Sequence, residues 1–298
     1  MSGSGVTVCA PAKINLFLHV GELRRDGYHE LESLVAFADF GDRLEFAPAS
    51  ELVLKLRGPF ASQVPRDGDN LVLKAARALD VSGGATITLE KNLPVEAGLG
   101  GGSSDGAAAL RGLNALWQLG RPEDELIQLA ASLGSDVPAC VLSRPCWMEG
   151  RGERVSPTEP LPMLSLVLVN PGVMLPTKAV FATLNARSGL GAMRPPRTPI
   201  RSIWDLVAYL KNAENDLEAP ACRLRPVIDD VLEALNHEPG CVLAQMSGSG
   251  ATCFALFDGH QFALGAAERI AEENPTWWVR AAKLASADIG APQQLSET

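Results

Sequence analysis

The sequence predicts an α+β protein with two domains. Three observations predict this fold class: the length of 298 residues, a content of 46% hydrophobic residues, and two separate series of strands and helices. A chain of this length can bury two ordinary cores, since a domain contains roughly 150 residues. Residues 149–162 are rich in glycine and proline and lie between the two series, so we place a boundary near residue 160 and expect domains at 1–160 and 161–298.

The first domain is expected to begin with strands. Residues 12–20 alternate between an apolar face and a face that carries Lys13 and Asn15, which predicts a half-buried strand with a polar working face. A turn at 26–27 leads into further strand over 31–46. The first part of the chain therefore resembles a β-meander.

A helix over 70–79 and a strand over 83–92 follow, and this strand runs directly into a glycine-rich loop. Four glycines between positions 98 and 102 allow positive φ and leave no side chain between the backbone amides and a ligand. Ser103 and Ser104 can cap the helix that comes next. Because free N–H groups and the positive end of a helix converge on one point, we expect an anion site, with phosphate as the usual occupant.

Two other kinds of phosphate loop do not fit this segment. A Walker A loop ends in Gly-Lys-Ser/Thr, which is absent, and a dinucleotide-binding GxGxxG loop needs a third glycine where Ser103 stands. The second mismatch excludes a dinucleotide oxidoreductase. A flexible linker or a plain helix cap explains one or two glycines, but not three in a row between a strand and a helix. A further helix over 121–134 then leads into a short loop that contains Asp136.

The second domain is expected to mix strands and helices as well. An apolar strand begins at Leu164, and an irregular, proline-containing excursion covers 187–200. The tail after residue 285 is expected to be loose. The other elements are helices over 203–210, 228–235 and 263–273, and strands over 242–246 and 252–257 that flank a glycine-containing loop.

Composition limits the possible partners. The formal net charge of −9 repels nucleic acid and anionic membranes, so we expect a small-molecule substrate and neither of those partners. No run approaches the roughly 18 apolar residues of a membrane span, and the N-terminus has no signal-peptide pattern, so we expect a cytoplasmic protein. The six cysteines form no CxxC pair and are expected to be buried free thiols. Monomer and homodimer both remain open.

The glycine-rich segment PVEAGLGGGSSD resembles the signature loop of the GHMP kinases, which cradles the triphosphate of ATP. PAKINLFLHVGELRRDGYHEL, LGSDVP and MSGSGATCFALF match, in order, further segments of one member of that superfamily. The resemblance covers nearly the whole chain. It implies a two-domain GHMP kinase fold, with an N-terminal domain like domain 2 of ribosomal protein S5 and a ferredoxin-like C-terminal domain. It also implies ATP and Mg²⁺ as cofactors and diphosphocytidyl methylerythritol as the phosphoryl acceptor.

The same resemblance implies which residues bind the nucleotide. Asn70 and Lys91 match positions near the adenine, and Ser103 or Ser104 is the expected protein contact to magnesium, a cation that otherwise keeps water and phosphate oxygens. Glu96 departs from expectation, because it puts a carboxylate beside the phosphates, pointing either to solvent or to the metal. The residues expected to wrap the phosphates are Pro94, Val95, Glu96, Ala97, Gly98, Leu99, Gly100, Gly101, Gly102, Ser103 and Ser104.

Phosphoryl transfer needs a proton acceptor for the attacking hydroxyl and cations that offset the charge on the transferred group. By resemblance Asp136 accepts the proton, although an exposed loop aspartate that caps a turn is the commoner role of such a residue. Lys13 keeps a neighbouring carboxylate ionised and lowers the pKa of the hydroxyl. Asn15 shares its strand face and by resemblance contacts the substrate.

The resemblance places the cytosine base on three aromatic residues. Tyr28 is expected to stack on the base, His29 to form hydrogen bonds with it, and Phe181 to close the other side. The position of Phe181 fits a core phenylalanine equally well. The loop that contains Gly248 and Gly250 is expected to close the substrate side, or to be a tight turn only.

Two alternatives remain open on this sequence. A kinase of the homoserine or mevalonate type shares the glycine loop, but its substrate would not use the base-binding segment DGYHEL at 26–31. A nucleotide sensor without turnover would share the fold, but it has no need of the pair Lys13 and Asp136.

Overall fold

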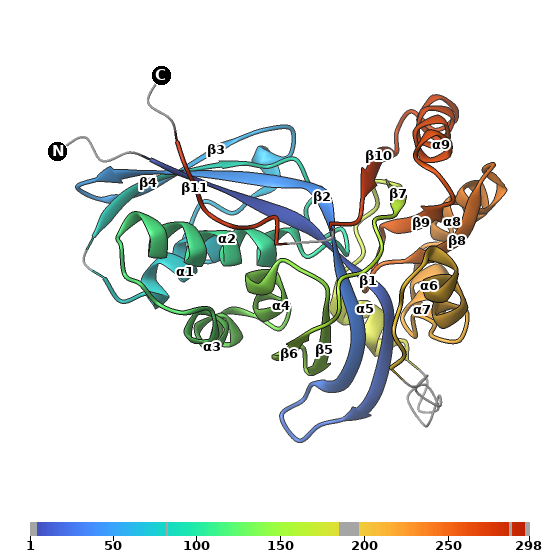
Figure 1. The fold of residues 1–298 in the computed structure, drawn as a ribbon, viewed down its shortest axis with the longest axis horizontal. Helices are drawn as coiled ribbons and strands as arrows, with labels where there is room; N and C mark the ends of the chain where they lie inside the picture. Colours follow the sequence, from blue (N-terminus) through green and yellow to red (C-terminus); the bar gives the residue numbers. More distant parts are fainter. Residues whose placement is uncertain (1–4, 82, 185–196, 286–287, 296–298) are drawn as a thin grey trace.

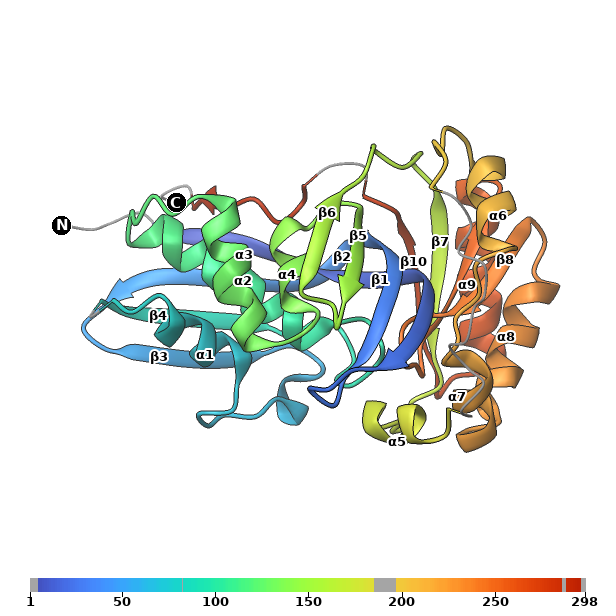
Figure 2. The ribbon, with the colours of Figure 1, turned by 90° about the horizontal axis from the view of Figure 1, so that it is seen from below.

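The computed structural model describes residues 5–81, 83–184, 197–285 and 288–295. They form two sheets with helices packed on them, which confirms the α+β class (Figures 1 and 2). The first sheet takes its strands from residues up to Pro157 and from the C-terminal strand, and the second sheet begins at Ser165. In chain order the elements are β1 (Val6–Leu23), β2 (His29–Ala49), β3 (Leu52–Arg57), a 3₁₀ turn (Ala61–Gln63), α1 (Leu71–Ala78), β4 (Gly84–Glu90), α2 (Gly101–Leu116), α3 (Glu123–Leu133), α4 (Val137–Leu142), β5 (Cys146–Gly150), β6 (Arg154–Pro157), β7 (Ser165–Asn170), α5 (Thr177–Ala182), α6 (Ile203–Leu210), α7 (Glu218–Leu224), α8 (Val227–His237), β8 (Cys241–Met246), β9 (Cys253–Phe257), α9 (His260–Glu273), β10 (Trp278–Lys283) and β11 (Gln293–Gln294).

The first sheet is built around the long antiparallel pair β1 and β2. Its order is β11-β1-β2-β4-β3, with β5 paired to β2 and β6 paired to β5. The hairpin of β1 and β2 extends beyond the body of the molecule (Figure 1). The register shifts on either side of Lys13 and Asn15, between Pro11 and Lys13 and between Asn15 and Phe17. Such irregularities re-aim side chains, and here they occur where the catalytic candidates lie.

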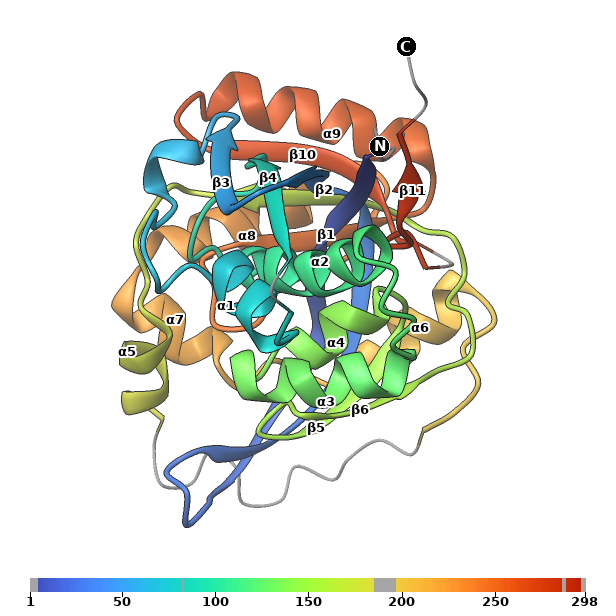
Figure 3. The ribbon, with the colours of Figure 1, turned by 90° about the vertical axis from the view of Figure 1, so that its left-hand side faces the viewer.

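The middle of β1 is buried on both faces, so the expectation of a half-buried strand was wrong. Helices α1 to α4 cover one face of the first sheet (Figure 3). On the other face, Ile14 and Leu16 pack in one cluster with Leu168 and Phe254 of the second sheet. Lys13 and Asn15 are therefore enclosed between layers rather than exposed to solvent.

The second sheet has the order β10-β7-β9-β8, and all of its pairs are antiparallel. With helices between β7 and β8 and helix α9 between β9 and β10, the chain order is βαββαβ, which is the ferredoxin-like arrangement that was expected. Hydrophobic residues of α7, α8 and α9 pack against this sheet. Among the described residues, no helix is long and apolar enough to cross a membrane.

The C-terminal segment returns to the first sheet. Strand β11 pairs with β1, and the amide of Ala285 donates to the carbonyl oxygen of Phe37. The second domain, expected at 161–298, therefore ends in residues that complete the first sheet. Residues 288–295 are not a loose tail. The backbone groups at the edge of β1 would otherwise be unpaired, and β11 forms a strand pair with them.

Candidate active site

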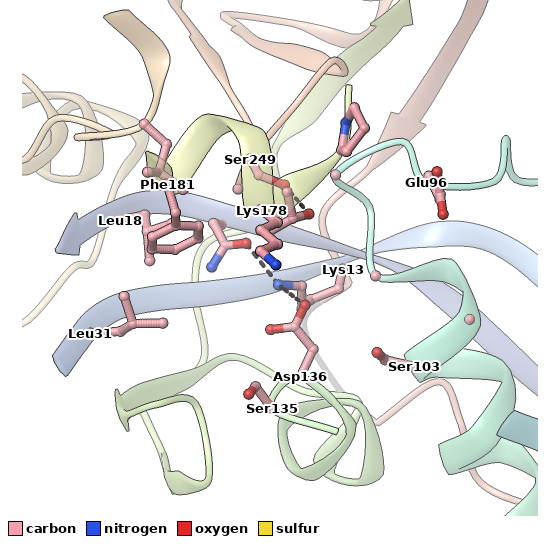
Figure 4. A pocket seen from close by; sticks show the side chains of 18 of the residues that line it. Lys13, Leu18, Leu31, Glu96, Ser103, Ser135, Asp136, Lys178, Phe181 and Ser249 are labelled. Carbon is pink, nitrogen blue, oxygen red and sulfur yellow. Dashed lines mark hydrogen bonds and ion pairs between the residues drawn. The ribbon is translucent and has the colours of Figure 1, made fainter. Parts of the chain in front are cut away.

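A cavity of about 1030 Å³ lies between the hairpin of β1 and β2, the glycine-rich loop and helix α5 (Figure 4). This volume is at the upper end of the range for ligand sites, so there is room for a nucleotide and an acceptor together. The sequence-predicted site residues that line it are Lys13, Asn15, Tyr28, His29, Val95, Glu96, Ala97, Gly98, Gly100, Gly101, Gly102, Ser103, Asp136 and Phe181. Asn70, Lys91, Pro94, Leu99 and Ser104 are not among the lining residues.

The glycine-rich loop has the backbone geometry of an anion cradle. Gly98 and Gly100 have φ of 77° and 60°, values in the left-handed region that favours glycine. Gly100 is the N-cap and helix α2 begins at Gly101, so the serines lie in the first turn and do not cap the helix as expected. A Cβ at Gly102 would meet no atom closer than 3.8 Å, so the helix end is open to a ligand. These features fit a phosphate group.

The two serines of this turn have different environments. The Ser104 hydroxyl is buried and donates to the carbonyl oxygen of Pro11 at 2.7 Å, so this side chain does not face the cavity. Ser103 does line it, and so does Glu96, whose side chain is exposed. No group of three His, Cys, Asp or Glu side chains suited to a metal occurs in the described part of the chain. The hydroxyl and the carboxylate suit Mg²⁺, but phosphate oxygens would have to complete its coordination.

Asn70 and Lys91 are also placed differently from the expectation. The Asn70 side chain caps α1, accepting from the amide of Val72 at 2.8 Å. The Lys91 ammonium is 2% exposed and forms ion pairs with Asp42 and Asp105. Both side chains therefore support elements around the loop instead of facing the cavity. Burial raises the pKa of Asp105, and the neighbouring Lys91 ammonium opposes this shift.

Lys13 and Asp136 meet at the centre of the cavity. The Lys13 Nζ lies 3.1 Å from Asp136 Oδ2 and donates to Asn15 Oδ1 at 2.7 Å. Lys13 is 3% exposed and Asp136 is 35% exposed, so the carboxylate remains accessible from the cavity. Asn15 Nδ2 donates in turn to Ser33 Oγ, which orients the amide oxygen toward the lysine. Asp136 precedes α4 but makes no side-chain capping bond, so the capping role considered for it does not apply.

Helix α4 is held in place by a buried arginine that the sequence reading missed. Arg111 of α2 donates through Nη1 to the carbonyl oxygens of Cys140 and Val141, near the end of α4. This contact ties the helix that follows Asp136 to the helix that follows the glycine loop. The six cysteines are free, three of them buried, and burial raises the pKa of Cys140 to about 12, so this neighbour of Asp136 stays a neutral thiol.

The loop at 247–252 joins the second domain to the glycine-rich loop. Ser247 Oγ donates to the carbonyl oxygen of Gly98 at 3.0 Å and accepts from the amide of Asn15 at 3.1 Å. The amide of Thr252 donates to the carbonyl oxygen of Ala97 at 3.1 Å. This loop is therefore more than a turn between two strands. Asn215, which the sequence reading also missed, supports it by donating to the carbonyl oxygen of Gly248.

The aromatic residues gather at the other end of the cavity. The rings of His29 and Phe181 are stacked with centroids 5.6 Å apart, and Tyr28 is 49% exposed. Phe181 lines the cavity and, partly buried, also packs against the hydrophobic residues of the second sheet. Two cationic side chains that were not predicted from the sequence, Arg151 and Lys178, line the same cavity. The Arg151 Cζ lies 5.3 Å from the centroid of the Tyr28 ring. The spacing of Lys178 and Phe181, three residues apart on one helix, could have indicated the lysine.

Figure 4 shows the order of these groups along the cavity. Phe181 lies at one end with Leu18 and Leu31. Glu96 and Ser103 lie at the other end, and Lys13 with Asp136 occupies the middle. The glycine-rich loop and the aromatic cluster are thus separated by the ion pair of Lys13 and Asp136.

The comparisons with known proteins agree with one another. Family models named GHMP kinases N terminal domain and GHMP kinases C terminal match residues 70–144 and 203–278. Proteins named 4-diphosphocytidyl-2-C-methyl-D-erythritol kinase are similar over most of the chain. The one from Paramagnetospirillum magneticum is 49% identical over 93% of this chain and 98% of its own. The one from Parvibaculum lavamentivorans is 48% identical over 94% of this chain and 98% of its own.

Solved structures extend the comparison. A crystal structure of 4-(cytidine 5'-diphospho)-2C-methyl-D-erythritol kinase has a TM-score of 0.75 and 36% identity, covering 94% of this chain and 99% of that one. Homoserine kinase from Cytophaga hutchinsonii has a TM-score of 0.72 at 16% identity, covering 98% of both chains. The second similarity concerns the fold alone.

Proposed function

Because the chain belongs to the 4-diphosphocytidyl-2-C-methyl-D-erythritol kinases of the GHMP kinase family, we propose that its cavity holds both substrates and that Lys13 and Asp136 promote the transfer between them. The enzyme phosphorylates the 2-hydroxyl of 4-diphosphocytidyl-2-C-methyl-D-erythritol with ATP, in the non-mevalonate pathway to isoprenoid precursors. The observation that carries the proposed assignment of residues is the ion pair of Lys13 and Asp136, located between a phosphate cradle and an aromatic cluster.

In this proposal Asp136 receives the proton of the attacking hydroxyl. Its carboxylate is partly exposed to the cavity and makes no capping bond, so its second oxygen remains available. General-base catalysis of this kind contributes about 100-fold or more. The Lys13 ammonium, held by Asn15 and Asp136, favours the ionised carboxylate and lowers the pKa of a hydroxyl brought beside it.

The glycine-rich loop binds the triphosphate through the open amides at the start of α2. Magnesium, when bound, would offset charge on the phosphates, and Ser103 with Glu96 are the chain's oxygen donors for it. The neighbouring Ser104 is omitted from this role because its hydroxyl is bonded to Pro11. Removal of the metal by a chelator is therefore expected to abolish turnover.

The aromatic end of the cavity binds the cytosine base through Tyr28, His29 and Phe181. Arg151 and Lys178 also line the cavity. In this proposal they bind the diphosphate that follows the base. All of these groups belong to one chain. The net charge of −9 supports an enzyme without nucleic acid or membrane partners, and we place this enzyme in the cytoplasm.

The proposed function is tested by ADP release from magnesium-ATP with three acceptors: 4-diphosphocytidyl-2-C-methyl-D-erythritol, homoserine and mevalonate. We expect turnover with the first compound alone, because only this acceptor has a base for the aromatic cluster. Turnover with homoserine or mevalonate instead would contradict the assignment of the base site. The assay repeated with a chelator measures the requirement for a divalent cation.

Replacing Tyr28 with alanine tests the base site itself. We expect Tyr28→Ala to raise KM for the cytidine substrate about 5- to 150-fold, because base stacking on an aromatic ring contributes about 1 to 3 kcal/mol. KM for ATP should change little. Tyr28 is 49% exposed, so the free energy of unfolding should stay near that of the wild type. Steady-state kinetics with each substrate varied in turn measure both constants, and equal effects on the two would place Tyr28 elsewhere.

A further inference from the structure

A cluster of three buried charges lies beneath the glycine-rich loop. Lys91 Nζ donates to Asp42 Oδ2 at 2.5 Å and to Asp105 Oδ2 at 2.6 Å. All three side chains are at most 5% exposed. Burying charges costs free energy even when they are paired, and replacing such clusters with apolar side chains is often neutral or stabilising. A cluster of this kind therefore calls for a reason other than stability.

Its contacts connect the two ends of the loop. Asp42 Oδ1 accepts from the amides of Asn92 and Leu93, immediately before the loop. Asp105 belongs to the first turns of α2, immediately after the loop. Lys91 joins the two carboxylates, so a bridge of side chains closes beneath residues 94–100.

The bridge lies directly against the expected phosphate cradle. A Cβ at Gly101, the first residue of α2, would be 3.0 Å from Lys91 Nζ. The loop above includes three residues with positive φ: Glu96 at 53°, Gly98 at 77° and Gly100 at 60°. A glycine-rich backbone of this kind can adopt many conformations of similar energy. If the distance between its two ends is fixed, fewer of these conformations are accessible before phosphate binds, so less conformational entropy is lost on binding.

We propose that Asp42, Lys91 and Asp105 form a clamp that positions the glycine-rich loop for the phosphates of the nucleotide, without contacting the nucleotide. This inference rests on the proposed role of the loop as the triphosphate site. It assigns Lys91 to the support of the loop rather than to the adenine. Asp105 is then a positioning residue, because its carboxylate anchors the helix end of the loop to Lys91.

The clamp is tested with Asp105→Ala. This substitution removes the anchor on α2 and leaves Lys91 and Asp42 as a buried ion pair without net charge. Calorimetric titration of the purified enzyme with ATP, ADP and adenosine measures the effect. We expect affinity for ATP and ADP to fall about tenfold, because one hydrogen bond between charged groups is lost from the support of the loop. Affinity for adenosine, which has no phosphate, should not change. Asp105→Asn should stay within about twofold of the wild type, because its amide oxygen still accepts from Lys91.

The sign of the effect separates the clamp from simple electrostatics. Removing a carboxylate near phosphates would by itself strengthen ATP binding. Unchanged or tighter ATP binding by Asp105→Ala would therefore overturn the clamp, and an equal loss for adenosine would place the cluster at the base. Asp105→Ser, too short to reach Lys91, provides a second truncation if the alanine variant does not fold. If the wild-type enzyme binds nucleotide but does not turn over the cytidine substrate, the proposed function is contradicted, whereas the binding comparison still tests the clamp.

Discussion

The Asp136→Asn enzyme is expected to retain its affinity for ATP and to lose kcat by a factor of about 100 or more. The amide keeps the shape of the carboxylate but cannot take the proton of the attacking hydroxyl. Its oxygen can still accept from Lys13, which lies 3.1 Å from the native carboxylate. Single-turnover measurements of phosphoryl transfer, with ATP binding measured separately, isolate the chemical step.

Thermal unfolding provides the control for this variant. Asp136 is 35% exposed and its ion pair is partly screened by solvent, so the unfolding temperature should change little. A matched control is Asp205→Asn, which changes the same chemical group at the start of α6, outside the residues that line the cavity. Wild-type kcat in Asp136→Asn would sink the assignment of Asp136 as proton acceptor, whereas loss in both variants would indicate an unspecific effect.

Gly98→Ala is expected to weaken the binding of both substrates at least about tenfold, since a methyl group there must displace backbone. A Cβ at this position would lie 2.5 Å from the carbonyl oxygen of Ser247 and 2.8 Å from that of Gly250. The positive φ of 77° adds a cost of about 1 to 2 kcal/mol for any L-residue. Ser247 Oγ also accepts from the amide of Asn15. A shift of this contact between the two loops is therefore expected to displace residues at both ends of the cavity. KM for ATP and for the cytidine substrate measure the two effects.

Gly120→Ala is the matched control for this substitution. Gly120 has a φ of 64°, but a Cβ there would meet no other atom within 4 Å. It therefore carries a similar cost of positive φ without the collision. We expect Gly120→Ala to lower the free energy of unfolding slightly and to leave both KM values unchanged. If Gly98→Ala behaves in the same way, the junction between the two loops does not set the geometry of the site.

The elements that sequence reading predicted well depend on local features. The helix over 70–79 appears as α1 with Asn70 as its cap, and the strand before the glycine loop appears as β4. Alternation and caps describe contacts within a few residues, so they can be read from the chain directly. The helices α4 and α5 were missed because each has only six residues, too few for a clear periodic pattern.

By itself, the sequence determined the two-domain α+β class, the family, and the segments that approach the cavity, because glycine spacing and motif order are properties of the chain. Only the tertiary structure decided which side chains face the ligands. Ser104 turns to Pro11, and Lys91 pairs with Asp42, 49 residues away in the chain. Strand β1 is buried on both faces because a second sheet, formed more than 100 residues later, packs on it. Such contacts depend on how distant elements pack, and no local periodicity describes that packing.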